Sequence, residues 1–100
     1  MMHYEEIESE GMVQLNVEGK IDSLNCDEFQ NLVLKSFTKT NTVIVNLEAV
    51  PYMSSAGLRA LIIGEKTAKS KGGKQIIINV QPQVQDVLRV TGFDSILEIR

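Results

Sequence analysis

The feature that most constrains the fold is a change of hydrophobic period between residues 42 and 62. Residues 42–47 (TVIVNL) form a β-branched, apolar run of strand length, whereas Leu58, Leu61 and Ile62 recur at helical spacing. A strand, a short turn and a helix are therefore predicted in that order. Ser54 and Ser55 lie where the period changes, and serine is a preferred helix cap because its oxygen accepts from an unpaired backbone N–H.

The same alternation of strand and helix patterns recurs along the chain. Strands are predicted at 3–8, 12–17, 42–47 and 74–80, helices at 25–38, 54–72 and 82–92, and a short last strand near 99. Strands separated by helices pair in parallel with right-handed crossovers, and the first two strands form an antiparallel hairpin. The expected fold is α/β, a mixed four- to five-stranded sheet with about three helices packed on one face.

Two local patterns refine this expectation. Val13, Leu15 and Val17 alternate with polar residues, so one face of the sheet should be wet. The first helix should begin with Asn25 as its cap, with Leu24 packing onto the helix as a hydrophobic staple. Its inward stripe is then predicted to be Phe29, Leu32, Val33 and Phe37.

Length and composition indicate one globular domain over residues 1–100. Of the 100 residues, 43% are hydrophobic and 23% charged, which is typical of a folded domain. No apolar run is long enough to span a membrane, and the N-terminal residues lack the cationic flank and apolar core of a signal peptide. A cytoplasmic protein is expected, and the predicted polar sheet face is compatible with a monomer.

Charge argues against a nucleic-acid partner. The net charge is −3, whereas phosphate binding needs clustered cations. Residues 59–74 are locally basic with a net charge of +4, and a solvated helix face is the favoured interpretation. The single cysteine, Cys26, cannot form an internal disulfide and is expected to be a buried small residue rather than a nucleophile.

The residue types needed for catalysis are not grouped in the sequence. The nucleophile spacing G-x-S-x-G does not occur, and the only histidine, His3, lies at the N-terminus, away from the serines. One histidine and one cysteine supply no zinc ligand set, and Gly72-Gly73 is not a phosphate-binding loop. We therefore expect no catalytic residue, no metal and no cofactor, and we predict that the protein is not an enzyme.

The two serines at the predicted turn allow two interpretations. Ser54 can be a helix cap and nothing more. A serine at an accessible helix N-terminus can also be phosphorylated, because the phosphoryl group meets unpaired N–H groups and the positive end of the helix dipole. The surface around Met53, Ala56 and Gly57 would then change from small and neutral to anionic, which can switch partners without a large conformational change.

Three short segments stand at the ends of predicted elements: Ser54 to Leu58 (SSAGL) at the start of the second helix, Gly19 to Asp22 (GKID) after the second strand, and Val90 to Phe93 (VTGF) before the last strand. Together they resemble the STAS domain superfamily, and more narrowly the bacterial anti-sigma factor antagonists. The run SSAGL is similar to that family's turn of aspartate, serine, a small or hydroxyl residue, glycine and leucine. The resemblance covers essentially the whole chain.

What the resemblance implies is a partner-switching regulator of transcription. Its unphosphorylated form would bind an anti-sigma factor that is also a serine kinase and would free a sigma factor. Phosphorylation by that kinase would release it, and a metal-dependent serine phosphatase would restore it. The alternative is a STAS interaction subunit of a larger assembly, such as a lipid-transport complex, in which the serine is only a cap.

The residues of this turn depart from the family pattern in two places. The family aspartate is Ser54 here, and the position directly before the glycine is Ala56, which has no hydroxyl. The resemblance therefore points to Ser55 as the phosphorylated residue, with Ser54 second. Asp22 either hydrogen-bonds the turn, contacts the partner or caps the first helix, and Arg59 is either a partner contact or a solvated arginine. The residues expected to bind the partner are Asp22, Met53, Ser54, Ala56, Gly57, Leu58 and Arg59.

Overall fold

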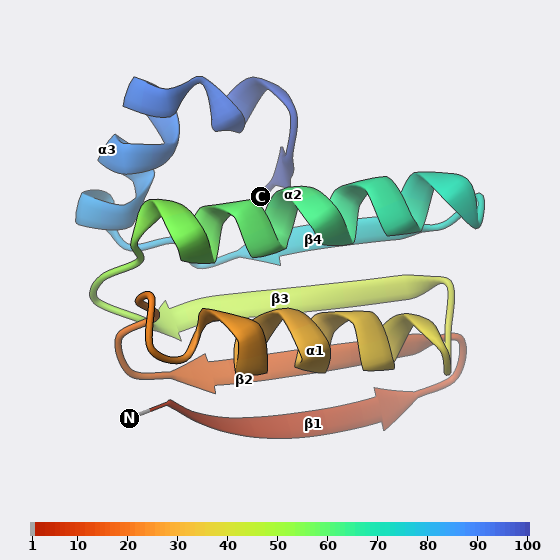
Figure 1. Ribbon diagram of the computed structural model, residues 1–100. Coiled ribbons are helices and arrows are strands. Elements are labelled where there is room, and N and C mark those ends of the chain that lie inside the picture. The colour runs from red at the N-terminus through yellow and green to blue at the C-terminus, as the bar shows by residue number, and fades with distance from the viewer. Residues whose placement is uncertain (1) are drawn as a thin grey trace.

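The computed structural model describes residues 2–100, which form five strands, three α-helices and one 3-10 helix (Figure 1). In chain order these are β1 (His3–Ser9), β2 (Met12–Glu18), α1 (Cys26–Phe37), β3 (Thr42–Ala49), α2 (Ser55–Ser70), β4 (Lys74–Ile78), α3 (Pro82–Thr91), η1 (Phe93–Ser95) and β5 (Glu98–Ile99).

The strands form one mixed sheet in the order β1-β2-β3-β4-β5. β1 and β2 are antiparallel, and each later neighbouring pair is parallel. Figure 1 shows α1 and α2 side by side in front of the sheet, with α3 beyond α2 on the β4 and β5 side. This arrangement confirms the predicted α/β fold, including the opening hairpin and the central position of the apolar strand 42–47.

The core lies between the sheet and the helices, and β2 and β3 bury alternate side chains in it. Leu15 on β2 and Val45 on β3 are fully buried, and Phe29 on α1 packs in the same cluster. Burying a side chain of this size contributes about 1.5–3 kcal/mol. The predicted stripe of α1 is confirmed, since the buried residues of that helix are Phe29, Leu32, Val33, Ser36 and Phe37.

The other face of the sheet carries a ladder of polar side chains. Asn79 Nδ2 donates to Asn46 Oδ1 (3.1 Å), and Asn46 Nδ2 donates to Asn16 Oδ1 (2.9 Å). Asn16 Nδ2 in turn donates to Glu5 Oε1 on β1 (3.2 Å). The predicted wet face is therefore present, and its amides hydrogen-bond to one another and to Glu5.

The predicted start of α1 is wrong in its details. Asn25 precedes the helix, but its side chain makes no cap: Oδ1 accepts from the backbone N–H of Asp22 (2.9 Å), and Nδ2 donates to Lys20 O (2.9 Å). Leu24 is 93% exposed and so cannot staple onto Phe29. The reason is that residues 22–25 close a turn of their own, in which the leucine faces solvent.

The other helix ends follow the sequence signals. Pro82 occupies the first turn of α3, and Gly92 ends that helix with a φ of 79°, a left-handed conformation that favours glycine. Within residues 2–100, no helix is both long and apolar enough to cross a membrane.

Candidate functional site

The turn between β3 and α2 is held against the segment that follows β2. The N–H of Ile21 donates to Tyr52 O (3.0 Å), and the N–H of Ser54 donates to Ile21 O (2.8 Å). These bonds form a short parallel bridge between Ile21 and Met53. The start of α2 is thus fixed by a contact between segments about thirty residues apart in the sequence.

The structure separates the roles of the two serines. Ser54 is the N-cap of α2, and its Oγ accepts from the backbone N–H of Gly57 (3.3 Å). Ser55 is the first residue of the helix and is exposed. Among the hydrogen bonds of residues 2–100, none engages the Ser55 side chain. The capping oxygen and the accessible hydroxyl therefore belong to different residues, which the sequence had left open.

The first turn of α2 is also suited to an anion. The first helical bond runs from the N–H of Leu58 to Ser54 O (3.0 Å), so the N–H groups of Ser55 and Ala56 lie before the helical bonds begin. The first turn contains no acidic residue to offset the positive end of the helix dipole. Negative charge placed on Ser55 would be stabilised there.

Three residues expected to contact a partner belong instead to the core. Met53 is 1% exposed and Leu58 is fully buried. A Cβ added at Gly57 would lie 2.7 Å from Met53 Cγ and 2.8 Å from Ile21 Cγ2, so the space beside this glycine is filled by the protein itself. The prediction that Met53, Gly57 and Leu58 form a docking surface is wrong, because the turn packs down onto Ile21.

Other residues make up the accessible surface around Ser55. Arg59 lies one turn further along α2 and is exposed, and Ala56 and Ser54 are partly exposed. Tyr52, just before the cap, is 48% exposed, and Leu24 projects from the neighbouring turn. The sequence analysis did not single out Tyr52, although an aromatic residue between Pro51 and the serines was a usable signal. It predicted that Leu24 packs onto α1, whereas the side chain is exposed.

Asp22 shapes the neighbouring turn. Its Oδ1 accepts from the backbone N–H of Leu24 (2.9 Å), and its carbonyl oxygen accepts from the N–H of Cys26 (2.9 Å). Of the three roles considered for Asp22, the geometry favours the local one at the start of α1. Asp22 itself is partly buried, and it is the preceding residue, Ile21, whose carbonyl oxygen accepts from the Ser54 N–H (2.8 Å).

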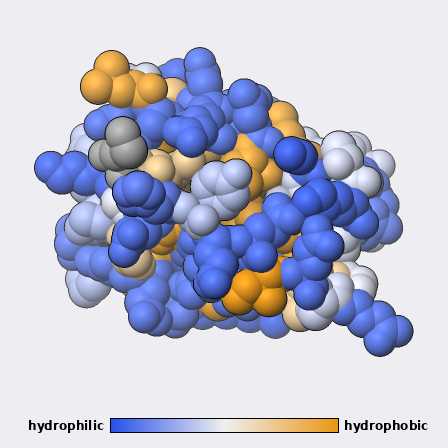
Figure 2. Space-filling model, turned by 90° about the horizontal axis from the view of Figure 1, so that it is seen from below, coloured by the Kyte–Doolittle hydropathy of each residue, from blue (hydrophilic) through white to orange (hydrophobic). Residues whose placement is uncertain are grey.

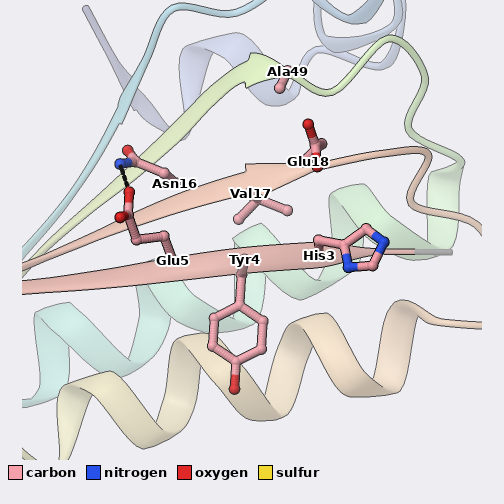
Figure 3. A pocket seen from close by; sticks show the side chains of 7 residues that line it. All are labelled: His3, Tyr4, Glu5, Asn16, Val17, Glu18 and Ala49. Atoms are coloured by element: carbon pink, nitrogen blue, oxygen red, sulfur yellow. Dashed lines mark hydrogen bonds between the residues drawn. The ribbon is translucent and has the colours of Figure 1, made fainter.

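Within residues 2–100, side chains that could support hydrolysis or metal binding are not assembled around the serines. His3 lies on β1 opposite Glu18 and lines a groove of about 300 Å³ with Glu5 and Asn16 (Figure 3), and neither serine lines that groove. In the described part of the chain, no group of three or more His, Cys, Asp or Glu side chains is placed to hold a metal ion. Cys26 is partly exposed rather than buried.

The family model described as the STAS domain matches residues 4–100. The chain belongs to the STAS domain family. This STAS domain is 26% identical over 91 residues to BtrV of Bordetella bronchiseptica, which is named as a candidate anti-sigma factor antagonist. That alignment covers 90% of this chain and 78% of BtrV.

Solved structures agree with the assignment of the fold. A candidate anti-sigma factor antagonist of Thermotoga maritima, TM1081, matches with a TM-score of 0.88 and 21% identity, over 96% of this chain and 84% of that one. The anti-sigma factor antagonist SpoIIAA, in its unphosphorylated form, matches with a TM-score of 0.75 and 17% identity, over 100% and 87%. The phosphorylated form of Bacillus SpoIIAA gives a TM-score of 0.74. The predicted STAS fold is confirmed.

Proposed function

We propose that this STAS domain is an anti-sigma factor antagonist whose binding is switched by phosphorylation of Ser55. Unphosphorylated, it binds an anti-sigma factor that is also a serine kinase and so frees a sigma factor for transcription in the cytoplasm. The kinase phosphorylates Ser55 and releases the domain, and a metal-dependent serine phosphatase restores it. The domain acts as substrate and binding module, and not as an enzyme.

The observation that supports the proposal most is that the two serines have different roles. Ser54 uses its oxygen to cap α2, whereas Ser55 presents an exposed hydroxyl at the first position of the same helix. A kinase needs a hydroxyl that can reach its active site without unfolding the substrate. Ser55 meets that requirement, and modification of Ser54 would sacrifice the cap.

Phosphorylation at this position changes the surface more than the fold. The phosphoryl group adds a charge of about −1.5 to −2 beside the unpaired N–H groups of the first turn, where a helix dipole stabilises an anion by roughly 0.3–1 kcal/mol. A partner packed against the neutral Ser55 surface would have to desolvate this charge. The nearly equal TM-scores to the two forms of SpoIIAA support a fold that accommodates the modification.

The test of the acceptor is intact-mass analysis after incubation with ATP and the kinase partner. We expect the unmodified chain to gain one phosphate, the Ser55→Ala variant to gain none, and the Ser54→Ala variant to gain one. Ser54→Ala is the matched control, because it removes the neighbouring hydroxyl and keeps the acceptor. Phosphate found on Ser54, or an unchanged reaction of Ser55→Ala, would contradict the proposal.

The test of the switch compares partner binding by the unmodified chain, Ser55→Asp and Ser55→Ala. We expect the anti-sigma factor to bind the unmodified chain and Ser55→Ala, and to lose affinity for Ser55→Asp. If all three variants retained the same partner, the domain would be a permanent subunit of an assembly and not a switch.

A further inference from the structure

β1 is an open edge of the sheet. It pairs with β2 on one side, and the sheet order places no strand on its other side within residues 2–100. Six of its seven residues are exposed, so unpaired backbone N–H and C=O groups face solvent along its length. At the opposite edge, β5 has only two residues. β1 is therefore the one long template in this sheet for pairing with another chain.

Grooves lie on both sides of this edge. One, of about 300 Å³, is lined by His3, Glu5, Asn16 and Glu18 among others (Figure 3). The second, of about 190 Å³, lies between β1 and α1 and is lined by Tyr4, Glu28, Asn31, Leu32 and Lys35. Figure 3 shows the Tyr4 side chain pointing to the helix layer, away from His3. Since side chains of a strand alternate between faces, a strand added to β1 would place them in the two grooves in turn.

The β1 edge is rich in acidic residues. Residues 3–10 include four glutamates, and Lys39 offsets two of them through Nζ, which lies 2.6 Å from Glu6 Oε2 and 3.1 Å from Glu8 Oε1. Glu5 and Glu10 take part in none of the ion pairs of residues 2–100. Two copies of β1 paired edge to edge would bring like charges together, so a second copy of this chain is disfavoured.

Acidic residues on an edge strand protect it against aggregation, and this alone can explain their presence. Exposed apolar side chains at the same edge favour association with another chain instead. Here Tyr4 is 51% exposed and Ile7 is 44% exposed. In Figure 2, which views the molecule from the β1 side, hydrophobic surface appears in separate areas among hydrophilic residues. Apolar contacts bordered by acidic ones suit a partner that alternates apolar and basic residues.

We propose that the β1 edge binds an extended basic peptide segment of a partner protein as a sixth strand, with basic side chains toward Glu5 and Glu18 and apolar ones toward Tyr4 and Leu32. The backbone N–H and C=O groups of β1 hydrogen-bond to the peptide backbone, and the two grooves select the side chains of the peptide. β2 separates this edge from the turn that carries Ser55, so the inference stands independently of the phosphorylation switch.

The test is an NMR titration of the ¹⁵N-labelled domain with a blocked heptapeptide of alternating valine and lysine. We expect saturable amide shifts concentrated on β1, and roughly fivefold weaker binding when added salt shortens the Debye length. Glu5→Lys should weaken binding roughly fivefold at low salt, the size expected from one exposed ion pair. Glu10→Lys repeats the test at a carboxylate outside the strand, and Asp86→Lys on α3 is the matched control, expected to change affinity less than about twofold.

Several results would overturn this inference. These are the absence of saturable β1 shifts at millimolar peptide, and an equal response to a heptapeptide of alternating valine and glutamate. Shifts centred on the first turn of α2 would place the peptide at the other site and would also contradict it. Sedimentation that showed a dimer formed through β1 would assign the edge to a second copy.

Discussion

Replacing Gly57 by alanine tests whether the first turn of α2 is closed by the protein's own core. The added Cβ would lie 2.7 Å from Met53 Cγ and 2.8 Å from Ile21 Cγ2. Both neighbours are buried, at 1% and 0% exposure, so neither side chain can move out into solvent. The clash must therefore be relieved by displacing the helix or by moving side chains out of their preferred rotamers.

Two opposing effects set the size of the change. Overpacking a core site costs about 1–3 kcal/mol, and two tight contacts with buried groups place Gly57→Ala in the upper part of this range. Alanine is better than glycine inside a helix by about 1 kcal/mol. We expect a net loss of about 1–2 kcal/mol in the free energy of unfolding, and a fall in Tm of about 4–8 °C for each kcal/mol.

Urea unfolding followed by circular dichroism measures this loss, and a double-mutant cycle with Met53→Ala assigns its cause. Met53→Ala removes one of the two atoms that the new Cβ would meet, so in that background Gly57→Ala should cost about 1 kcal/mol less. If Gly57→Ala left the stability unchanged or raised it in the wild-type background, the turn would be open and our account of Gly57 would be wrong.

Three further predictions concern single side chains. Ser54→Ala should lower the free energy of unfolding by about 1 kcal/mol through loss of the cap, and Ser55→Ala should change it by less than about 0.5 kcal/mol; equal losses in urea unfolding would contradict the separate roles of the serines. Burial raises the pKa of the Glu65 carboxyl, Lys69 opposes this shift and Glu98 adds to it. The folded protein therefore holds the proton of the Glu65 carboxyl more tightly than the unfolded chain does. The free energy of unfolding falls as the pH rises from the ordinary pKa of glutamate through the raised one. Glu65→Gln should accordingly unfold at higher temperature than wild type at neutral pH, and the difference should vanish below the ordinary pKa of glutamate; a difference independent of pH would refute this. Leu24→Ala should change the stability by less than about 0.5 kcal/mol, since the side chain is 93% exposed, and a loss above about 1 kcal/mol would revive the staple onto Phe29.

The fold was predictable from local signals that act together. Alternating and apolar runs placed the strands, and Pro82 and Gly92 marked the limits of α3, because each of these residues has a narrow backbone preference. The start of α1 was not predictable in the same way. A cap pattern at Asn25 fits a helix start, but that side chain bonds to Lys20 and Asp22 instead, through contacts that precede the helix.

The position of the site in the chain was predictable, but which of its side chains are exposed was not. The change of period put Ser54 and Ser55 at the helix start, but a shift of one residue in the backbone decides which serine caps. The burial of Met53 depends on Ile21, which lies far away in the sequence and meets it only through tertiary pairing. The small residues in the first turn of α2 therefore indicated close approach, and the group that approaches Gly57 is the domain's own core.

Charge added to Ser55 is expected to change partner binding while the fold persists. The most direct measurement is calorimetric titration of the anti-sigma factor against the chain carrying phosphoserine at position 55 and against the unmodified chain. Leaving a buried charge unpaired costs about 2–5 kcal/mol, so we predict that phosphorylation weakens the affinity by at least about thirtyfold, with no loss in Tm of the isolated domain. Equal affinity of the two forms, or unfolding of the phosphorylated one, would contradict the account.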